Sequence, residues 1–68
     1  MMPGDVVVIG AFDEVPEHWF RVDEVYDDCV GGVALTGPLA GEYGEPETQM
    51  IVRVLTPEEV RQGTHLSQ

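Results

Sequence analysis

Residues 4–10 read Gly-Asp-Val-Val-Val-Ile-Gly, and this short stretch decides the fold class. Its four central side chains are all β-branched, which favours a strand, and the flanking glycines favour turns. A strand that is apolar at every position is buried on both faces. It therefore needs cover from a second sheet layer, a helix or another subunit.

The chain that follows predicts a polar loop and a second strand. Residues 11–18 carry three acids and a proline, which keep this segment out of a regular sheet. A strand is predicted over residues 19–26, where apolar and polar side chains alternate until Val25 falls on the wrong parity. A bulge near residues 23–24 would restore the register.

Two further strands are predicted in the second half of the chain. The pair Gly31-Gly32 permits turn angles, and residues 33–36 form the next strand with Val33 and Leu35 pointing inward. Residues 49–55 are nearly continuously apolar. We expect this last strand to be central in the sheet, or covered on its second face.

Between these two strands lies the most distinctive local composition of the chain. Residues 36–47 contain three glycines and two prolines, which exclude a helix or a long strand. Leu39 and Tyr43 offer apolar anchors, and the prolines reduce the entropy lost on ordering. We expect a compact, ordered loop that carries specificity.

A short helix is predicted over residues 56–62. Thr56 can cap its first turn, and Glu59 completes a capping box with it. Gly63 is expected to end the helix, and residues 64–68 are expected to form a flexible tail.

The charge of the chain restricts its partners. Thirteen Asp and Glu residues stand against three Arg and no Lys, which gives a net charge of −10. Binding to nucleic acid or to anionic lipid depends on basic side chains, so both classes of partner are excluded. Proteins, cations and small ligands remain.

Size and cysteine content indicate a small intracellular domain. The 68 residues form a single domain, residues 1–68, which buries only about 60% of its unfolded surface. Cys29 is the only cysteine, so no internal disulfide can form, and a reducing, cytoplasmic location fits best. The apolar run at residues 6–9 is too short for a signal peptide or a membrane span.

Four or five short strands and one late helix predict a mainly β fold. We expect a small barrel or a rolled antiparallel sheet, because closure removes exposed strand edges. The Gly-Asp-x-Val opening at residues 4–7, the polar loop, the later strands and the terminal helical turn resemble the small SH3-like barrels over residues 4–60. The resemblance implies a binding role, and the missing basic residues depart from its nucleic-acid-binding members.

Two groups of residues are candidates for partner contacts. Trp19 and Arg21 are residue types that dominate interface hot spots, although Trp19 could equally cover one end of the barrel. Tyr43, with acidic neighbours, could serve a cationic or amide-bearing partner. The predicted contact residues are Trp19, Arg21, Leu39, Tyr43, Glu42 and Glu45.

The residue types for metal binding or catalysis are present without a supporting pattern. His18, Asp27, Asp28, Cys29 and His65 lie at no interval typical of zinc sites, so we expect a small buried thiol and two solvated imidazoles. Cys29 and His18 could pair as nucleophile and base, but so short a chain has little structure to orient a third group. We therefore predict no metal, no cofactor and no enzyme activity.

Three functions remain open. The leading hypothesis is a non-catalytic protein-binding module that forms a homo-oligomer, because residues 6–9 and 50–55 are apolar on both faces. The second is a binding protein for small cationic ligands, which the acidic loops would attract. The third is a mimic of nucleic acid, in which carboxylates stand in for phosphates.

Overall fold

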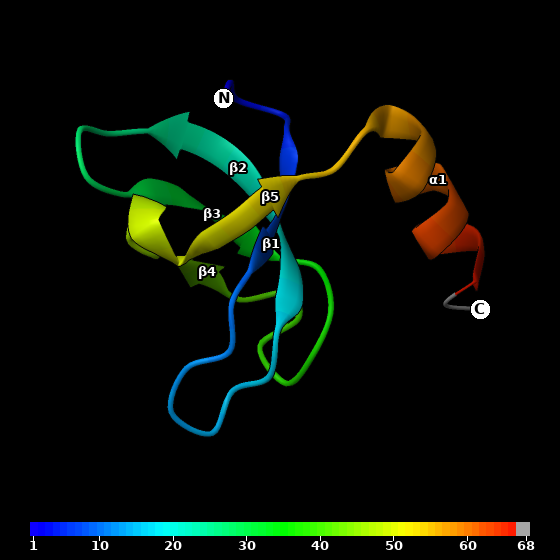
Figure 1. Cartoon of the computed structure of the whole chain (residues 1–68), viewed down its shortest axis with the longest axis horizontal. Coiled ribbons are helices and arrows are strands. Elements are labelled where there is room, and N and C mark those ends of the chain that lie inside the picture. The colour runs from blue at the N-terminus through cyan, green and yellow to red at the C-terminus, as the bar shows by residue number, and fades with distance from the viewer. Residues whose placement is uncertain (67–68) are drawn as a thin grey trace.

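The protein forms one five-stranded antiparallel sheet followed by a helix (Figure 1). This computed structural model describes the backbone of residues 1–66 and the side chains of residues 1–63. The elements are β1 (Val6–Ile9), β2 (His18–Val25), β3 (Val30–Ala34), β4 (Tyr43–Gly44), the 3₁₀ turn η1 (Thr48–Met50), β5 (Ile51–Val54) and α1 (Pro57–Leu66). A mainly β fold with a short C-terminal helix is thus confirmed.

The strand order is β4-β3-β2-β1-β5, so β4 and β5 are the two edges of the sheet. After β4 the chain keeps to the start of β3, where the amide of Val30 donates to the carbonyl of Pro46. The turn η1 then carries the chain across to β5, which pairs with β1. Since β4 and β5 do not pair with each other, the sheet remains open.

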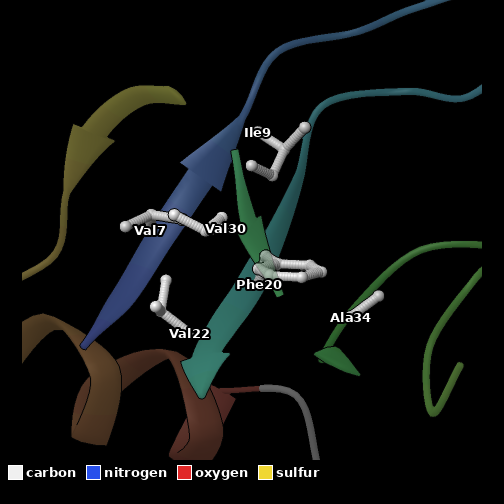
Figure 2. Packing of buried hydrophobic residues seen from close by; sticks show 6 residues of the cluster. All are labelled: Val7, Ile9, Phe20, Val22, Val30 and Ala34. Atoms are coloured by element: carbon white, nitrogen blue, oxygen red, sulfur yellow. The ribbon is translucent and has the colours of Figure 1, made fainter. Parts of the chain in front are cut away.

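One face of the sheet holds the main core, which Figure 2 shows at close range. Alternate residues of β1, β2 and β3 point into it because side chains of a strand alternate between faces. The buried members are Val7, Ile9, Phe20, Val22, Val30 and Ala34, with Leu39, Met50 and Ile51 packed against them.

The other face of β1 is covered by the C-terminal part of the same chain. Val6, Val8 and Leu55 form a second buried cluster, against which Trp19 and Val60 of α1 pack. Every residue of β1 is buried. Both faces of β1 are therefore covered by the same chain: the main core lies on one face, and the second cluster with α1 lies on the other. No second subunit is needed to bury this strand.

The predicted bulge in β2 is confirmed, but Gly31 and Gly32 do not form the turn expected of them. The register between β2 and β3 shifts between Val22 and Glu24. Gly31 and Gly32 lie inside β3, which begins earlier than predicted and buries Ala34, whereas Leu35 is exposed. Gly32 is required there because a Cβ at this position would overlap the backbone carbonyl of Arg21.

The prediction that the last strand is central or covered on both faces is wrong. β5 is an edge strand, and Val52 and Val54 are 58% and 45% exposed. The register between β1 and β5 shifts between Val8 and Ile9, so strict alternation does not hold along the pair. Among residues 50–55, only Leu55, just beyond β5, is buried.

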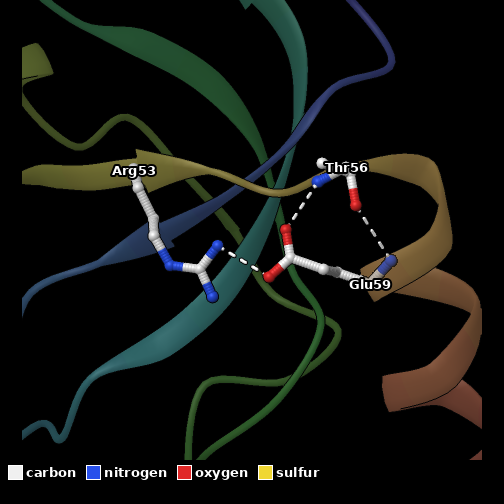
Figure 3. Close-up of polar contacts among 3 residues, drawn as sticks. All are labelled: Arg53, Thr56 and Glu59. Atoms are coloured by element: carbon white, nitrogen blue, oxygen red, sulfur yellow. Dashed lines mark hydrogen bonds and ion pairs between the residues drawn. The ribbon is translucent and has the colours of Figure 1, made fainter.

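The capping box predicted for α1 is confirmed (Figure 3). The amide of Glu59 donates to Oγ1 of Thr56 over 3.1 Å, and the amide of Thr56 donates to Oε1 of Glu59 over 3.0 Å. The other carboxylate oxygen of Glu59 accepts from the Arg53 guanidinium over 2.8 Å. One carboxylate therefore ties the helix start to β5.

The helix does not end at Gly63, as the sequence led us to expect, but continues to Leu66. Gly63 faces the indole ring of Trp19, and a Cβ at this position would overlap that ring. The glycine thus permits a close approach of helix to sheet instead of ending the helix. Part of the predicted tail is therefore helical, and residues 67–68 lie outside the described residues.

The Glu59 contacts predict an acid-sensitive helix. The Thr56 amide and then the Arg53 guanidinium lower the pKa of the Glu59 carboxyl. A lowered pKa in the folded state adds stability above the unfolded pKa, about 4.3 for Glu, and this stability is lost as the pH falls through the folded value. We expect Glu59→Gln to weaken the acid-induced change in Trp19 fluorescence, because the charge is gone while an amide acceptor remains.

The matched control for this change is Glu58→Gln. It removes the same charge from the same helical turn, and the described contacts give this side chain no hydrogen bond. Equal acid sensitivity in the two variants would contradict the role of Glu59.

Candidate functional site

A pocket of about 280 Å³ opens on the core face of the sheet, where the loop after β1 meets the chain around β4. Its base is apolar because Ile9, Phe20 and Ala34 of the main core reach it. The full lining is Ile9, Phe12, His18, Phe20, Ala34, Leu39, Glu42, Tyr43, Gly44, Glu45 and Pro46.

The loop of residues 36–42 forms one wall of this pocket through a series of tight turns. Gly37 and Gly41 have φ angles of 81° and 88°, which side chains other than glycine rarely adopt. The amide of Gly41 donates to the carbonyl of Ala34, and the amide of Glu42 donates to the carbonyl of Leu39. These turns set Leu39 into the pocket and Glu42 at its rim.

His18 lies in the wall of the pocket and is only 5% exposed. Its Nδ1 is 2.9 Å from the carbonyl oxygen of Pro16, and its ring lies 6.3 Å from the ring of Phe12. A carbonyl oxygen can only accept, so Nδ1 must carry the proton of this hydrogen bond. The expectation of a solvated imidazole is therefore wrong for His18.

Tyr43 and Glu45 form the polar rim with Glu42. The hydroxyl of Tyr43 donates to Oε2 of Glu45 over 3.1 Å, while the ring itself is 59% exposed. Partial desolvation, followed by the hydrogen bond to Glu45 and its charge, raises the pKa of Tyr43 to about 12. The rim therefore presents an aromatic ring held beside carboxylates.

This arrangement predicts the titration of Tyr43. A folded pKa above the ordinary value of about 10 means that the tyrosine adds stability below pH 10, which is lost as the pH rises towards 12. Glu45→Gln should lower the Tyr43 pKa, since it removes a negative neighbour and a charged acceptor. Absorbance at the phenolate band, in a Tyr26→Phe background, measures Tyr43 alone.

The Asp28→Asn variant in the same background serves as control, because it removes one charge elsewhere on the chain. A Tyr43 titration that is the same with and without the Glu45 carboxylate would contradict the contact.

The structure brings together four of the six predicted contact residues. Leu39, Glu42, Tyr43 and Glu45 all line the pocket. Trp19 and Arg21 pair with Val8 and Val6, which places them on the opposite face of the sheet. There Trp19 packs with the second cluster under α1, and the exposed Arg21 guanidinium binds Asp23.

Sequence reasoning did not assign Phe12, His18 and Phe20 to the site. A signal for two of them was present, because His18 and Phe20 alternate with Val22 on the core face of β2. Phe12 lies in a turn closed by its backbone pairing with Val15. Nothing in its local sequence indicates that this turn folds towards β4.

The residues considered for metal binding and catalysis do not assemble among the described residues. No group of three His, Cys, Asp or Glu side chains within residues 1–63 is placed to hold a metal ion, and the His65 side chain lies outside the described part. Partial burial and then the charges of Asp28 and Glu45 raise the pKa of the Cys29 thiol. Such a thiol is a weak nucleophile at neutral pH.

Within the described residues, no helix has the length and apolar character required to cross a membrane. The chain matches no protein-family model, no curated protein and no solved structure.

Proposed function

We propose that this protein is a non-catalytic binding module that receives a positively charged segment of another protein in the pocket beside β4. The observation that carries the proposal is the composition of the pocket: an apolar base, aromatic walls and two carboxylates at the rim. A cationic side chain with an apolar stem complements all three. The net charge of −10 would speed the approach of such a partner.

The remaining features favour binding over catalysis. Cys29, the only thiol, has a raised pKa, which makes it a weak nucleophile at neutral pH. The single cysteine also suits a reducing compartment such as the cytoplasm.

The strand arrangement supports an SH3-like barrel as the scaffold of the module. The two edge strands of the sheet, β4 and β5, follow each other in the chain, and the connection between them contains η1. A barrel of this kind would present its ligand on loops that a rigid sheet holds in place.

An NMR titration of the ¹⁵N-labelled protein tests the proposal. We expect peptides that combine arginine or lysine with apolar residues to shift the amides of Phe12, Gly44 and Glu45, whereas acidic peptides of equal length should shift none. Raising the ionic strength from about 0.01 to about 1 M should weaken this binding. A panel of basic peptides that leaves these amides unmoved would refute the function.

Two double variants with equal charge separate the pocket from the overall charge. Glu42→Gln with Glu45→Gln should lose the binding, and Asp27→Asn with Asp28→Asn should keep it. If both pairs weakened binding equally, the attraction would be general and the pocket would not be the site.

A small cationic ligand is the second candidate, and the enclosed part of the same pocket favours it. Ile9, Phe20 and Leu39 offer a contact surface that a compact amine could fill without a peptide. Thermal shifts with a panel of free amines distinguish the two. Shifts with free amines that exceed those with basic peptides would favour the small ligand.

We further propose that the module associates with a second copy through β5. Its exposed Val52 and Val54 lie on an open edge, and residues 48–57 contain no acid, so two copies meet there with least repulsion. Light scattering should show a dimer fraction that increases with the salt concentration. Val52→Lys with Val54→Lys should abolish the dimer, even though the smaller net negative charge of this variant reduces the repulsion between copies.

The control for the dimer is Val25→Lys, an equally exposed valine (46%) at the end of β2. It should leave the dimer intact. A monomer at high protein concentration and molar salt would refute association through β5, and a larger ring or filament would indicate a head-to-tail contact instead.

A further inference from the structure

We propose that the group held in the pocket is the guanidinium of an arginine side chain, with Nε2 of His18 as one of its acceptors. This inference rests on the proposed function, since it names the chemistry of the positively charged segment. It depends on which hydrogen-bonding roles remain open in the pocket.

While the His18 ring is uncharged, the polar side chains of the pocket offer a ligand only acceptor positions. Nδ1 of His18 donates to the Pro16 carbonyl, so Nε2 is the acceptor of the uncharged ring. The only hydroxyl hydrogen of Tyr43 is donated to Glu45. Carboxylates of Glu42 and Glu45 accept hydrogen bonds and do not donate. A ligand that pairs with these side chains must therefore supply the donors, and the two carboxylates repel ligand carboxylates and phosphates.

His18 strengthens this requirement because little of its surface is exposed. Its residue exposure is 5%, and the hydrogen bond described for the ring uses Nδ1 alone. A ligand that displaces water from Nε2 without donating to it leaves a buried acceptor unpaired. We therefore expect the occupant to carry a donor for the imidazole as well as donors for the carboxylates at the rim.

A guanidinium meets these conditions better than an ammonium. It is flat, carries five donors in a fixed plane and is weakly hydrated, so it can stack on an aromatic ring while it binds acceptors at its edge. The lining of the pocket includes aromatic rings from Phe12, Phe20 and Tyr43, and its acceptors come from His18, Glu42 and Glu45. An ammonium is a strongly hydrated point charge and gains less from flat rings.

Three capped amino acids test the inference directly: N-acetyl-arginine amide, N-acetyl-lysine amide and N-acetyl-citrulline amide. The citrulline compound has nearly the shape of arginine without its charge. With ¹⁵N-labelled protein, we expect the arginine compound to move the amides of Phe12 and Gly44 and the Nε2 resonance of His18. Lysine should bind about tenfold more weakly, since its ammonium has fewer donors than the guanidinium, and citrulline more weakly still, since its hydrogen bonds are uncharged.

The Nε2 resonance is the readout that a general electrostatic attraction would not move. Glu42→Gln with Glu45→Gln should weaken the arginine compound, whereas Asp27→Asn with Asp28→Asn should not. Because these variants leave the His18 ring and the core unchanged, the test does not depend on a variant that may fail to fold.

The outcomes separate this inference from the proposed function. Equal binding of the arginine and lysine compounds, or binding without a change at Nε2, would overturn the arginine site while a basic partner could still bind. Basic peptides that shift the pocket amides when the arginine compound does not would overturn it as well. If no basic peptide binds at all, both proposals fail.

Discussion

Adding a single methyl group at Gly32 is expected to destabilise the protein severely. A Cβ at this position would overlap the backbone carbonyl oxygen of Arg21 and would lie 3.0 Å from a ring carbon of Phe20. Because the obstacle is backbone, β3 can accept Ala only by moving away from β2, which disrupts their shared ladder. Overpacking ordinarily costs about 1–3 kcal/mol, and we expect Gly32→Ala to reach or exceed the upper value.

This loss would be a large part of the total stability. At roughly 0.05–0.15 kcal/mol per residue, a domain of this length has a free energy of unfolding of about 3–10 kcal/mol. Urea unfolding followed by Trp19 fluorescence measures the change. Trp19 is the only tryptophan and lies between the sheet and α1, so its emission reports on both.

Gly44→Ala is a closely matched control. Gly44 of β4 is the direct register partner of Gly32, and a Cβ there would meet nothing within 4 Å. Its free energy of unfolding should stay within about 0.5 kcal/mol of the parent, as for other open surface positions. Equal stability of the two alanine variants would show that β2 and β3 do not approach as closely as described.

The glycines explain why part of the fold was predictable and part was not. A glycine can mark a turn or a close approach, and only the tertiary structure decides between them. Gly37 and Gly41 do form turns, as their surroundings indicate, whereas Gly32 and Gly63 sit where a carbonyl or an indole comes too close for a side chain. Sequence reasoning therefore placed β3 too late and ended α1 too early.

Features with local causes were predicted correctly. The capping box needs only Thr56 and Glu59 at the right spacing, and the β2 bulge follows from a break in alternation near Asp23. The exposure of β5 has no such local cause. Val52 and Val54 look like core residues in the sequence, and they are exposed because β5 is at the edge of the sheet.

The candidate site was predicted in part for the same reason. Leu39 and Tyr43 share one compact loop with their acidic neighbours, so composition alone groups them. Trp19 and Arg21 were chosen for their residue types, but strand parity puts them on the other face, where Trp19 supports α1. His18 belongs to the pocket by that same parity, which shows that position on a strand outweighs residue type here.

The two phenylalanines of the chain provide the last test, because the core and the pocket share one of them. Phe20 is 3% exposed, belongs to the main core and lines the pocket, whereas Phe12 lines the pocket and is 37% exposed. Phe20→Ala should cost about 3–5 kcal/mol, which is enough to leave much of this small protein unfolded. Urea unfolding compares it with the parent.

Phe12→Ala should cost no more than about 1 kcal/mol, because its ring is already partly in water. It should nevertheless weaken the binding of basic peptides, since one aromatic wall of the pocket is lost. A variant that folds normally and binds poorly would separate the pocket from the core. If instead Phe12→Ala unfolds the protein while Phe20→Ala does not, the assignment of core and pocket is reversed.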